Sequence, residues 1–224
     1  MIKPILFLLL SITSSYSFSQ KLNSDVHIFD SSPKLETIDK SKYIQNNMLT
    51  LEKEQTLNNL LITSSYQDFF DTIKKYSLKD EDYIKYLLSK SDQGHIPTYW
   101  LIADYYAKKN EPKETHKWLY IATIMTQQDS YLCHDITAKN APRILLKSFP
   151  ETVLIVRKTP QYIQQVMSDV FFFIYNIKQR INPDWACKYG NLGHKSYNTP
   201  TIPKQNWEQQ RQDVLKRFSD KYMN

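Results

Sequence analysis

Three consecutive residues, Cys133, His134 and Asp135, carry the side chains of a nucleophilic triad: a thiol, a base and a carboxylate that could orient the base. Such a triad works only when its three side chains converge within hydrogen-bond distance. Adjacent residues of a helix point in different directions, so their adjacency in the chain opposes convergence. The sequence therefore predicts no catalytic site here.

A zinc site is the second chemistry that these residues could support, with Cys133, His134, Cys187 and His194 as a Cys2His2 ligand set. Zinc-binding motifs place their ligands in closely spaced pairs, and this spacing matches none of them. A disulfide between the two cysteines would also remove both thiolate ligands. We therefore expect neither a metal nor a cofactor.

The first 19 residues have the features of a secretory signal peptide. Lys3 supplies the positive charge, residues 5–10 form an apolar run, and Ser17 with Ser19 forms a small-x-small cleavage pattern. The apolar run is much shorter than the roughly 20 residues of a membrane-spanning helix, and no later run is longer. We expect a mature protein that begins near Gln20, is soluble in the bacterial periplasm and has no integral membrane segment.

Cys133 and Cys187 are the only cysteines of the chain. In an exported protein an even number of cysteines favours a disulfide, with two buried thiols as the alternative. A bridge would close a loop of about 55 residues and stabilise the fold by roughly 4 kcal/mol. It would also hold the loop around Trp185.

Glycine is scarce: the 224 residues contain three, all at or after Gly94. Dinucleotide-binding and P-loop folds need glycine where the backbone approaches phosphate, and their motifs are missing. Sandwiches and barrels need many turns with positive φ. The composition therefore favours an all-α fold.

Helical periodicity divides the chain into four parts: the signal peptide (1–19), a polar N-terminal arm (20–41), a helical domain (42–181), and a Pro/Gly-rich loop with a basic C-terminal amphipathic helix (182–224). Within the domain, the pattern predicts helices over residues 43–61, 67–76, 80–90, 96–109, 112–126 and 139–149. A long helix follows Thr159 and Pro160, and we expect it to be the most buried. The last helix has Trp207, Val214 and Phe218 on one face, with Arg211 beside that face. Docking of that face on the domain is favoured over binding to an anionic membrane surface.

One stretch, residues 94–126, has the spacing of a helical repeat. Its two helices pack through aromatic, aliphatic and small residues: Tyr99, Ile102, Ala103, Tyr106, Thr115, Trp118, Leu119 and Ala122. This spacing resembles the tetratricopeptide (TPR) pattern, and "THKWLYIAT" is similar to the corresponding run of Sel1-type repeats. The resemblance implies antiparallel helical hairpins in a short Sel1/TPR-like array. Since one repeat cannot bury its own apolar face, flanking helices must cap it.

In such repeats the inner face of the first helix tends to hold ligands. By position this face comprises Trp100, Asp104 and Lys108. With the loop around Trp185, these are the residues that we expect to contact a partner. The alternative is a solvated face on which the charged residues form salt bridges.

The resemblance also implies a function. Exported Sel1-type proteins include immunity proteins that neutralise phospholipase effectors of type VI secretion systems, and residues 118–150 are similar to that group. We therefore expect a periplasmic protein-binding module whose partner is a cognate toxin, with no enzymatic activity and, because of the compartment, no nucleic-acid partner. A cell-envelope hydrolase that uses Asp129 or Asp135, or a secretion or peptidoglycan scaffold, are the alternatives.

Overall fold

The structure is a computed structural model, and it describes residues 51–62, 68, 72, 80–191 and 200–222. All of these belong to the unit Asn47–Asn224, and the unit Met1–Asn46 lies outside the described residues. The predicted signal peptide, the polar arm and most of the predicted helix over 67–76 therefore lie outside the description.

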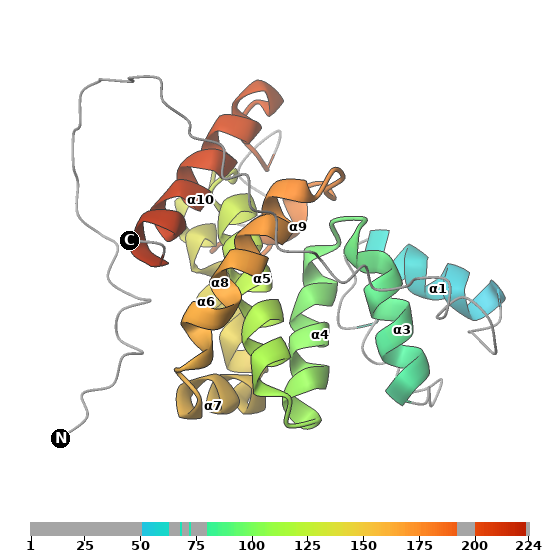
Figure 1. The fold of residues 1–224 in the computed structure, drawn as a ribbon. Coiled ribbons are helices and arrows are strands. Elements are labelled where there is room, and N and C mark those ends of the chain that lie inside the picture. The colour runs from blue at the N-terminus through green and yellow to red at the C-terminus, as the bar shows by residue number, and fades with distance from the viewer. Residues whose placement is uncertain (1–50, 63–67, 69–71, 73–79, 192–199, 223–224) are drawn as a thin grey trace. The chain divides into compact units, whose positions relative to one another are not determined.

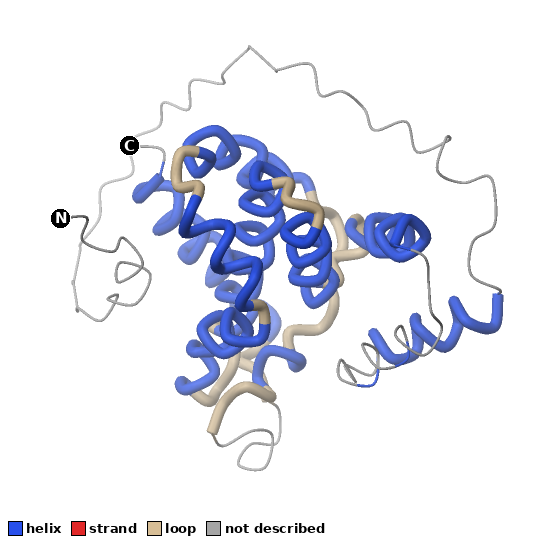
Figure 2. Tube along the Cα trace, turned by 90° about the horizontal axis from the view of Figure 1, so that it is seen from below, coloured by secondary structure: helices blue, strands red, loops and turns tan. Residues whose placement is uncertain are grey.

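The described part of the chain is all-α, as the sequence predicts (Figures 1 and 2). Its α-helices are α1 (Leu51–Ile62), α3 (Asp80–Ser91), α4 (Ile96–Lys108), α5 (Pro112–Ser130), α6 (Ala141–Ser148), α7 (Pro150–Lys158), α8 (Tyr162–Asn176), α9 (Asp184–Cys187) and α10 (Trp207–Tyr222). Two 3-10 helices, η3 (Ile136–Asn140) and η4 (Lys204–Asn206), precede α6 and α10. No strand occurs among these residues, although Cys133 and Thr201 form an isolated antiparallel bridge.

Helices α4 and α5 form the hairpin that the sequence predicts over residues 94–126 (Figure 1). Asn110, with φ of 55°, makes the turn, and Pro112 stands in the first turn of α5. The eight predicted packing residues lie in the hairpin; Tyr106 is half-buried, and the other seven are buried: Tyr99, Ile102, Ala103, Thr115, Trp118, Leu119 and Ala122. This packing is compatible with a Sel1/TPR-like unit, and the family resemblance itself stays a prediction.

Helix α5, and not α8, is the most buried of the long helices. Fourteen of its 19 residues are buried, because α4, α8 and α10 all pack against it. Helix α8 buries five of its 15 residues and exposes Phe172 and Tyr175. The sequence overestimated the burial of α8 because its consecutive phenylalanines, residues 171–173, cannot all face the core of one helix.

Residues 139–149, predicted as one helix, are divided between η3 and α6, and α7 follows directly. Prolines account for these boundaries, since Pro142 and Pro150 stand in the first turns of α6 and α7. A residue before proline avoids helical dihedrals, and Phe149 accordingly has φ of −125° and ψ of 61°. The chain therefore turns sharply at Phe149, whose ring enters the core.

Helix α10 docks on α5 and α8, as the sequence favours. Val214 and Leu215 are buried in this contact, and Arg211 is buried beside them. Within the described residues, no helix combines the length and apolarity needed to cross a membrane.

The segment after α8 crosses the start of α4 at Gly94. The main-chain N–H of Ile181 donates to the carbonyl oxygen of Gly94 (3.5 Å). Gly94 has φ of 66°, and a Cβ atom there would collide with the carbonyl oxygen of Gln179 and lie 2.6 Å from Cα of Arg180. A glycine is therefore needed at this position for both its conformation and its size, and the crossing fixes the backbone that carries Arg180.

Candidate functional site

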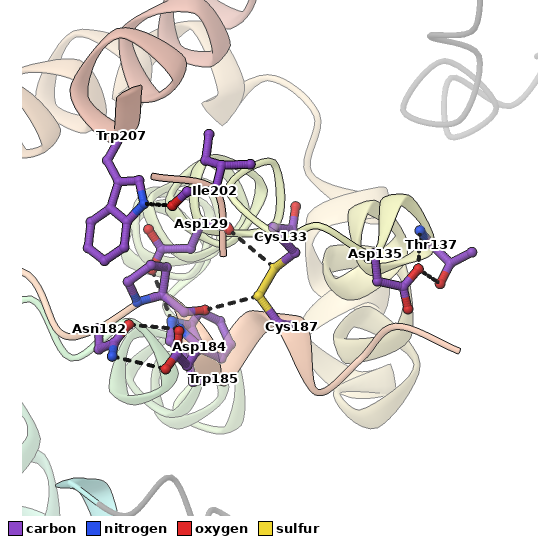
Figure 3. The surroundings of a disulfide bond; sticks show 12 residues. Asp129, Cys133, Asp135, Thr137, Asn182, Asp184, Trp185, Cys187, Ile202 and Trp207 are labelled. Carbon is purple, nitrogen blue, oxygen red and sulfur yellow. Dashed lines mark hydrogen bonds between the residues drawn. A yellow bond between two sulfur atoms is a disulfide. The ribbon is translucent and has the colours of Figure 1, made fainter. Parts of the chain in front are cut away.

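Asp129, near the C-terminal end of α5, is completely buried and accepts hydrogen bonds from three side chains. Its Oδ1 accepts from Nη2 of Arg180 (3.2 Å) and from Nε and Nη2 of Arg211 (3.3 and 3.0 Å). Its Oδ2 accepts from Nε1 of Trp185 (3.0 Å; the two residues are drawn in Figure 3). The carboxylate is thus paired and hydrogen-bonded at both oxygens, which a buried charge requires.

Gln128 extends this network to a second layer. Its Oε1 accepts from Nη1 of Arg180 (2.9 Å), and its Nε2 donates to the main-chain oxygen of Arg211 (2.9 Å). Burial lowers the pKa of Arg180, while the carboxylate of Asp129 opposes this shift. We call Gln128, Asp129, Arg180, Trp185 and Arg211 the Asp129 cluster; it holds two guanidinium groups and one carboxylate.

A small cavity of about 80 Å³ lies beside the Asp129 cluster, where α5, α8 and α10 meet. Its polar lining comes from both arginines of the cluster and from Gln128, Glu208 and Gln212. Tyr175 contributes to the lining from α8, and its side chain is largely exposed. The exposed Gln212 donates from Nε2 to Oε1 of Glu208 one turn before it (2.7 Å).

The predicted disulfide between Cys133 and Cys187 is confirmed (Figure 3). It joins the segment that follows α5 to α9 across 54 residues of sequence, with the two Cα atoms 5.4 Å apart. Asn182 accepts from the main-chain N–H of Asp184 at the start of α9 (3.2 Å). The bridge and the Asp129 cluster therefore hold the loop around Trp185 on α5 from two sides.

Trp100 and Trp185, predicted to contact a partner, are instead buried, each about 1% exposed. Nε1 of Trp100 donates to Oγ1 of Thr126 (3.0 Å), and its ring stacks on Phe149 with centroids 5.7 Å apart. Trp185 donates to Asp129. Neither indole can form part of a binding surface on this fold, so both predictions are corrected.

Asp104 and Lys108 lie one turn apart on the same face of α4, as predicted, and form an ion pair (2.7 Å). The hydroxyl of Thr152 in α7 donates to Oδ1 of Asp104 (3.2 Å). Phe149 and Thr152, from the junction of α6 and α7, therefore occupy much of the face that a ligand would use. The side chain of Lys108 stays 61% exposed, and a role of Asp104 and Lys108 in partner binding stays a prediction.

Arg180 and Arg211 were not recognised from the sequence as members of a site. For Arg211 a signal existed: Trp207, Arg211, Val214 and Phe218 have the spacing of one helical face. An arginine inside an apolar stripe must meet an acceptor in the core. The sequence pattern predicts Arg211 beside this stripe, and the structure places it within the buried contact.

Of the residues considered as a triad or a zinc site, His194 lies outside the described residues, and Cys133, Cys187 and Asp135 have structural partners. Cys133 is in the disulfide, His134 is exposed, and Asp135 accepts from the main-chain N–H and the hydroxyl of Thr137 (2.9 and 2.6 Å) at the start of η3. Among the described residues, no group of three or more histidine, cysteine and acidic side chains is placed to hold a metal ion.

His116 is a buried titratable group outside the Asp129 cluster. Its Nε2 lies 3.1 Å from Oγ1 of Thr159, whose hydroxyl donates to the main-chain oxygen of Ile155 (2.8 Å). The hydroxyl proton is therefore committed to Ile155, so Nε2 must carry the imidazole proton and donate it. Nδ1 is buried without a partner among the described residues, and burial lowers the pKa of His116.

Comparison with known proteins adds no family to this description. No family model, no curated protein and no solved structure matches the chain. The similarity to Sel1 and TPR repeats thus rests on residues 94–126 alone.

Proposed function

We propose that this chain is an exported protein-binding module, and specifically an immunity protein that neutralises a type VI lipase effector in the periplasm by tight association. One observation carries the binding function: α8 exposes two aromatic side chains one turn apart, Phe172 (51%) and Tyr175 (61%), and Tyr175 also lines the polar cavity. Exposed aromatic residues next to arginines are typical of the anchors of protein interfaces. The similarity of residues 118–150 to immunity proteins supplies the class of partner.

The state of the buried carboxylates favours binding over hydrolysis. A catalytic carboxylate must reach the substrate or a water molecule directly. Asp129 is fully buried and saturated by donors from Arg180, Arg211 and Trp185, whereas Asp135 is buried and caps η3 through Thr137. These are the two acids that the hydrolase alternative would use, and both have structural partners instead.

The module would act by covering a surface of the toxin, and it needs no chemistry of its own. The aromatic pair belongs to α8, which packs along the central helix α5. The disulfide and the Asp129 cluster fix the segment that follows α8. A rigid surface loses little conformational entropy on binding, which favours tight association.

The test exports the product of the neighbouring gene to the periplasm, with and without this protein. Rescue of growth together with copurification of a stable complex supports the immunity function. A harmless neighbour, or killing that this protein does not relieve, contradicts it.

The same assay tests the binding surface. Phe172→Ala with Tyr175→Ala should weaken the complex at least about tenfold, because two anchor side chains are lost. Leu154→Ala is a matched control, since Leu154 is 49% exposed on α7, and it should leave the affinity unchanged. Full affinity of the double variant would show that the aromatic pair is not the interface.

A further inference from the structure

We propose that the exposed faces of α6 and α7 form a surface that binds an anionic phospholipid bilayer. This α6–α7 surface comprises Arg143, Ile144, Lys147, Leu154, Arg157 and Lys158. It belongs to other helices than the aromatic pair of α8, so the inference goes beyond the proposed function. It adds a second ligand, and it can be tested without a protein partner.

Helix α6 presents an aliphatic side chain between basic ones. Its inner face packs on α5 and η3, and Leu145 and Leu146 are half-buried against the core. On the opposite face Arg143, Ile144 and Lys147 are exposed, and helical geometry places these three side chains next to one another. Ile144 is 39% exposed. The outer face of α6 therefore combines apolar surface with two positive charges.

Helix α7 repeats this combination. Its inner face packs on α4 and α5 and buries Thr152. Leu154 lies at the middle of the exposed face and is 49% exposed. Arg157 and Lys158, one turn later, lie on either side of Leu154, and Glu151 lies one turn before it. Two consecutive helices thus each expose an aliphatic residue flanked by cations.

The charges of this surface are not balanced. Residues 141–158 contain four basic side chains and one acidic side chain, so three positive charges are in excess. Within the described part of the chain, none of the four cations forms an ion pair. Two acids on the helices beneath are already paired, Asp104 with Lys108 and Glu114 with Lys117. The excess charge is therefore available to an anionic ligand.

The apolar residues favour a bilayer over an acidic protein as that ligand. Protein interfaces are anchored mainly by aromatic residues and arginines that fill pockets, and leucine is under-represented among such anchors. Neither α6 nor α7 contains an aromatic residue. A fluid bilayer accepts separate aliphatic side chains without a matching pocket, while the lysine and arginine side chains around them reach the headgroup phosphates. The α6–α7 surface has this arrangement.

A sedimentation assay with lipid vesicles tests the proposal. The chain from Gln20 onward is used, because the apolar run of the signal peptide would itself bind lipid. We expect it to sediment with vesicles of equal parts phosphatidylglycerol and phosphatidylcholine, and not with vesicles of phosphatidylcholine alone. Raising the salt from about 0.1 M to about 0.5 M should weaken binding at least about tenfold, because salt screens the charges. Equal binding to both kinds of vesicle, or binding to neither, would overturn the proposal.

Two pairs of lysine substitutions test the position of the surface. Lys147→Gln with Lys158→Gln should weaken vesicle binding at least about tenfold, since each cation near an anionic surface contributes about fivefold. Lys178→Gln with Lys188→Gln changes the net charge equally at two exposed lysines outside α6 and α7, and it should leave binding nearly unchanged. Equal losses in the two double variants would show that net charge, and not the α6–α7 surface, attracts the vesicles.

A further pair of substitutions tests insertion of the aliphatic side chains. Ile144→Ser with Leu154→Ser should weaken vesicle binding at least about fivefold, because less apolar area leaves water. Both residues are exposed, so circular dichroism should show an unchanged fold. Phe172→Ala with Tyr175→Ala is the control and should keep vesicle binding. If the serine variant bound as well as the original chain, charge alone would attract the vesicles; the cations would then suit an acidic protein equally well, which contradicts the proposal.

The outcomes separate this inference from the proposed function. Vesicle binding by a chain that gives no rescue from the toxin retains the membrane surface and removes the immunity function. Rescue by a chain that binds no vesicles retains immunity and removes the membrane surface.

Discussion

Asp129 decides, at the scale of single residues, whether the arginines of the cluster can be buried. An unpaired charge in a protein interior is strongly destabilising. The carboxylate neutralises part of the charge of Arg180 and Arg211 and accepts hydrogen bonds from their guanidinium N–H groups. A buried ion pair adds little net stability over apolar packing, but removal of one partner leaves the other uncompensated.

We therefore expect Asp129→Asn to lower the free energy of unfolding by about 3–5 kcal/mol. Asparagine keeps the shape but loses the charge, and its NH₂ group would face donors. Urea denaturation followed by circular dichroism measures the loss. The control is Asp104→Asn, which breaks an ion pair with the exposed Lys108 and should change stability by less than about 1 kcal/mol. Similar losses of stability in both variants would show that the buried carboxylate of Asp129 matters no more for folding than the partly exposed carboxylate of Asp104.

His116 makes the stability of the fold depend on pH. Burial lowers its pKa below the ordinary value of 6.5, so the unfolded chain binds a proton at a higher pH than the folded chain does. The stability that comes from the neutral imidazole is present above pH 6.5 and is lost as the pH falls below that value. His95 acts in the same direction, because burial and then Lys90 lower its pKa.

We expect the urea concentration at the midpoint of unfolding to decrease as the pH is lowered from 7 to 5. The decrease should be smaller in His116→Gln, whose side-chain amide can still donate a hydrogen bond to Thr159. The control is His134→Gln, which removes an exposed imidazole and should keep the original pH dependence. An unchanged dependence in His116→Gln would mean that this imidazole is not responsible.

At the scale of secondary-structure elements, Gly94 sets how the segment after α8 passes α4. The left-handed backbone conformation alone costs a non-glycine residue about 1–2 kcal/mol. We expect Gly94→Ala to lower the free energy of unfolding by more than this, because its Cβ would also collide with the main chain of Gln179 and Arg180. Asn110→Gly, at a second described residue with positive φ, should change stability by only a few tenths of a kcal/mol. Thermal unfolding of both variants measures the difference, and similar melting temperatures would contradict the crowding at Gly94.

Helices α4 and α5 could be predicted closely because apolar spacing and Pro112 define them locally. The division between α6 and α7 was missed, although Pro142 and Pro150 mark the starts of both helices. What no local pattern shows is that Phe149 then stacks on Trp100. The spacing of residues in α4 is the same whether the indole of Trp100 is exposed or buried. The predicted ligand face of α4 could therefore be corrected only from tertiary packing.

At the scale of the whole molecule, the Asp129 cluster joins residues that lie 51 and 82 positions apart in the sequence. Periodicity reports which face of a helix is apolar, but it does not report which helices meet. The disulfide was predictable because the chain has two cysteines, which allow a single intramolecular pairing, and because its signal-peptide pattern predicts export to an oxidising compartment. The arginines had many acidic candidates, and only the fold selects Asp129.

The bridge between Cys133 and Cys187 should contribute about 4 kcal/mol to stability, because it restricts the unfolded chain across 54 residues. We expect this loss in Cys133→Ala with Cys187→Ala, measured by urea denaturation. A reductant should destabilise the original chain and leave the double variant unaffected. If reduction left the original chain as stable as before, the disulfide would not make this contribution to stability.

Cys133 also holds both ends of the stretch 188–200. It is bonded to Cys187 on one side and bridged to Thr201 on the other, with main-chain hydrogen bonds from His134 to Pro200 (3.0 Å) and from Ile202 to Leu132 (2.8 Å). The two ends meet at one place whatever the length of chain between them, and doubling a loop adds only about 0.6 kcal/mol of closure entropy. The docking of α10 is therefore set by these contacts at Cys133 and its neighbours, and it depends little on how many residues separate Cys187 from Thr201.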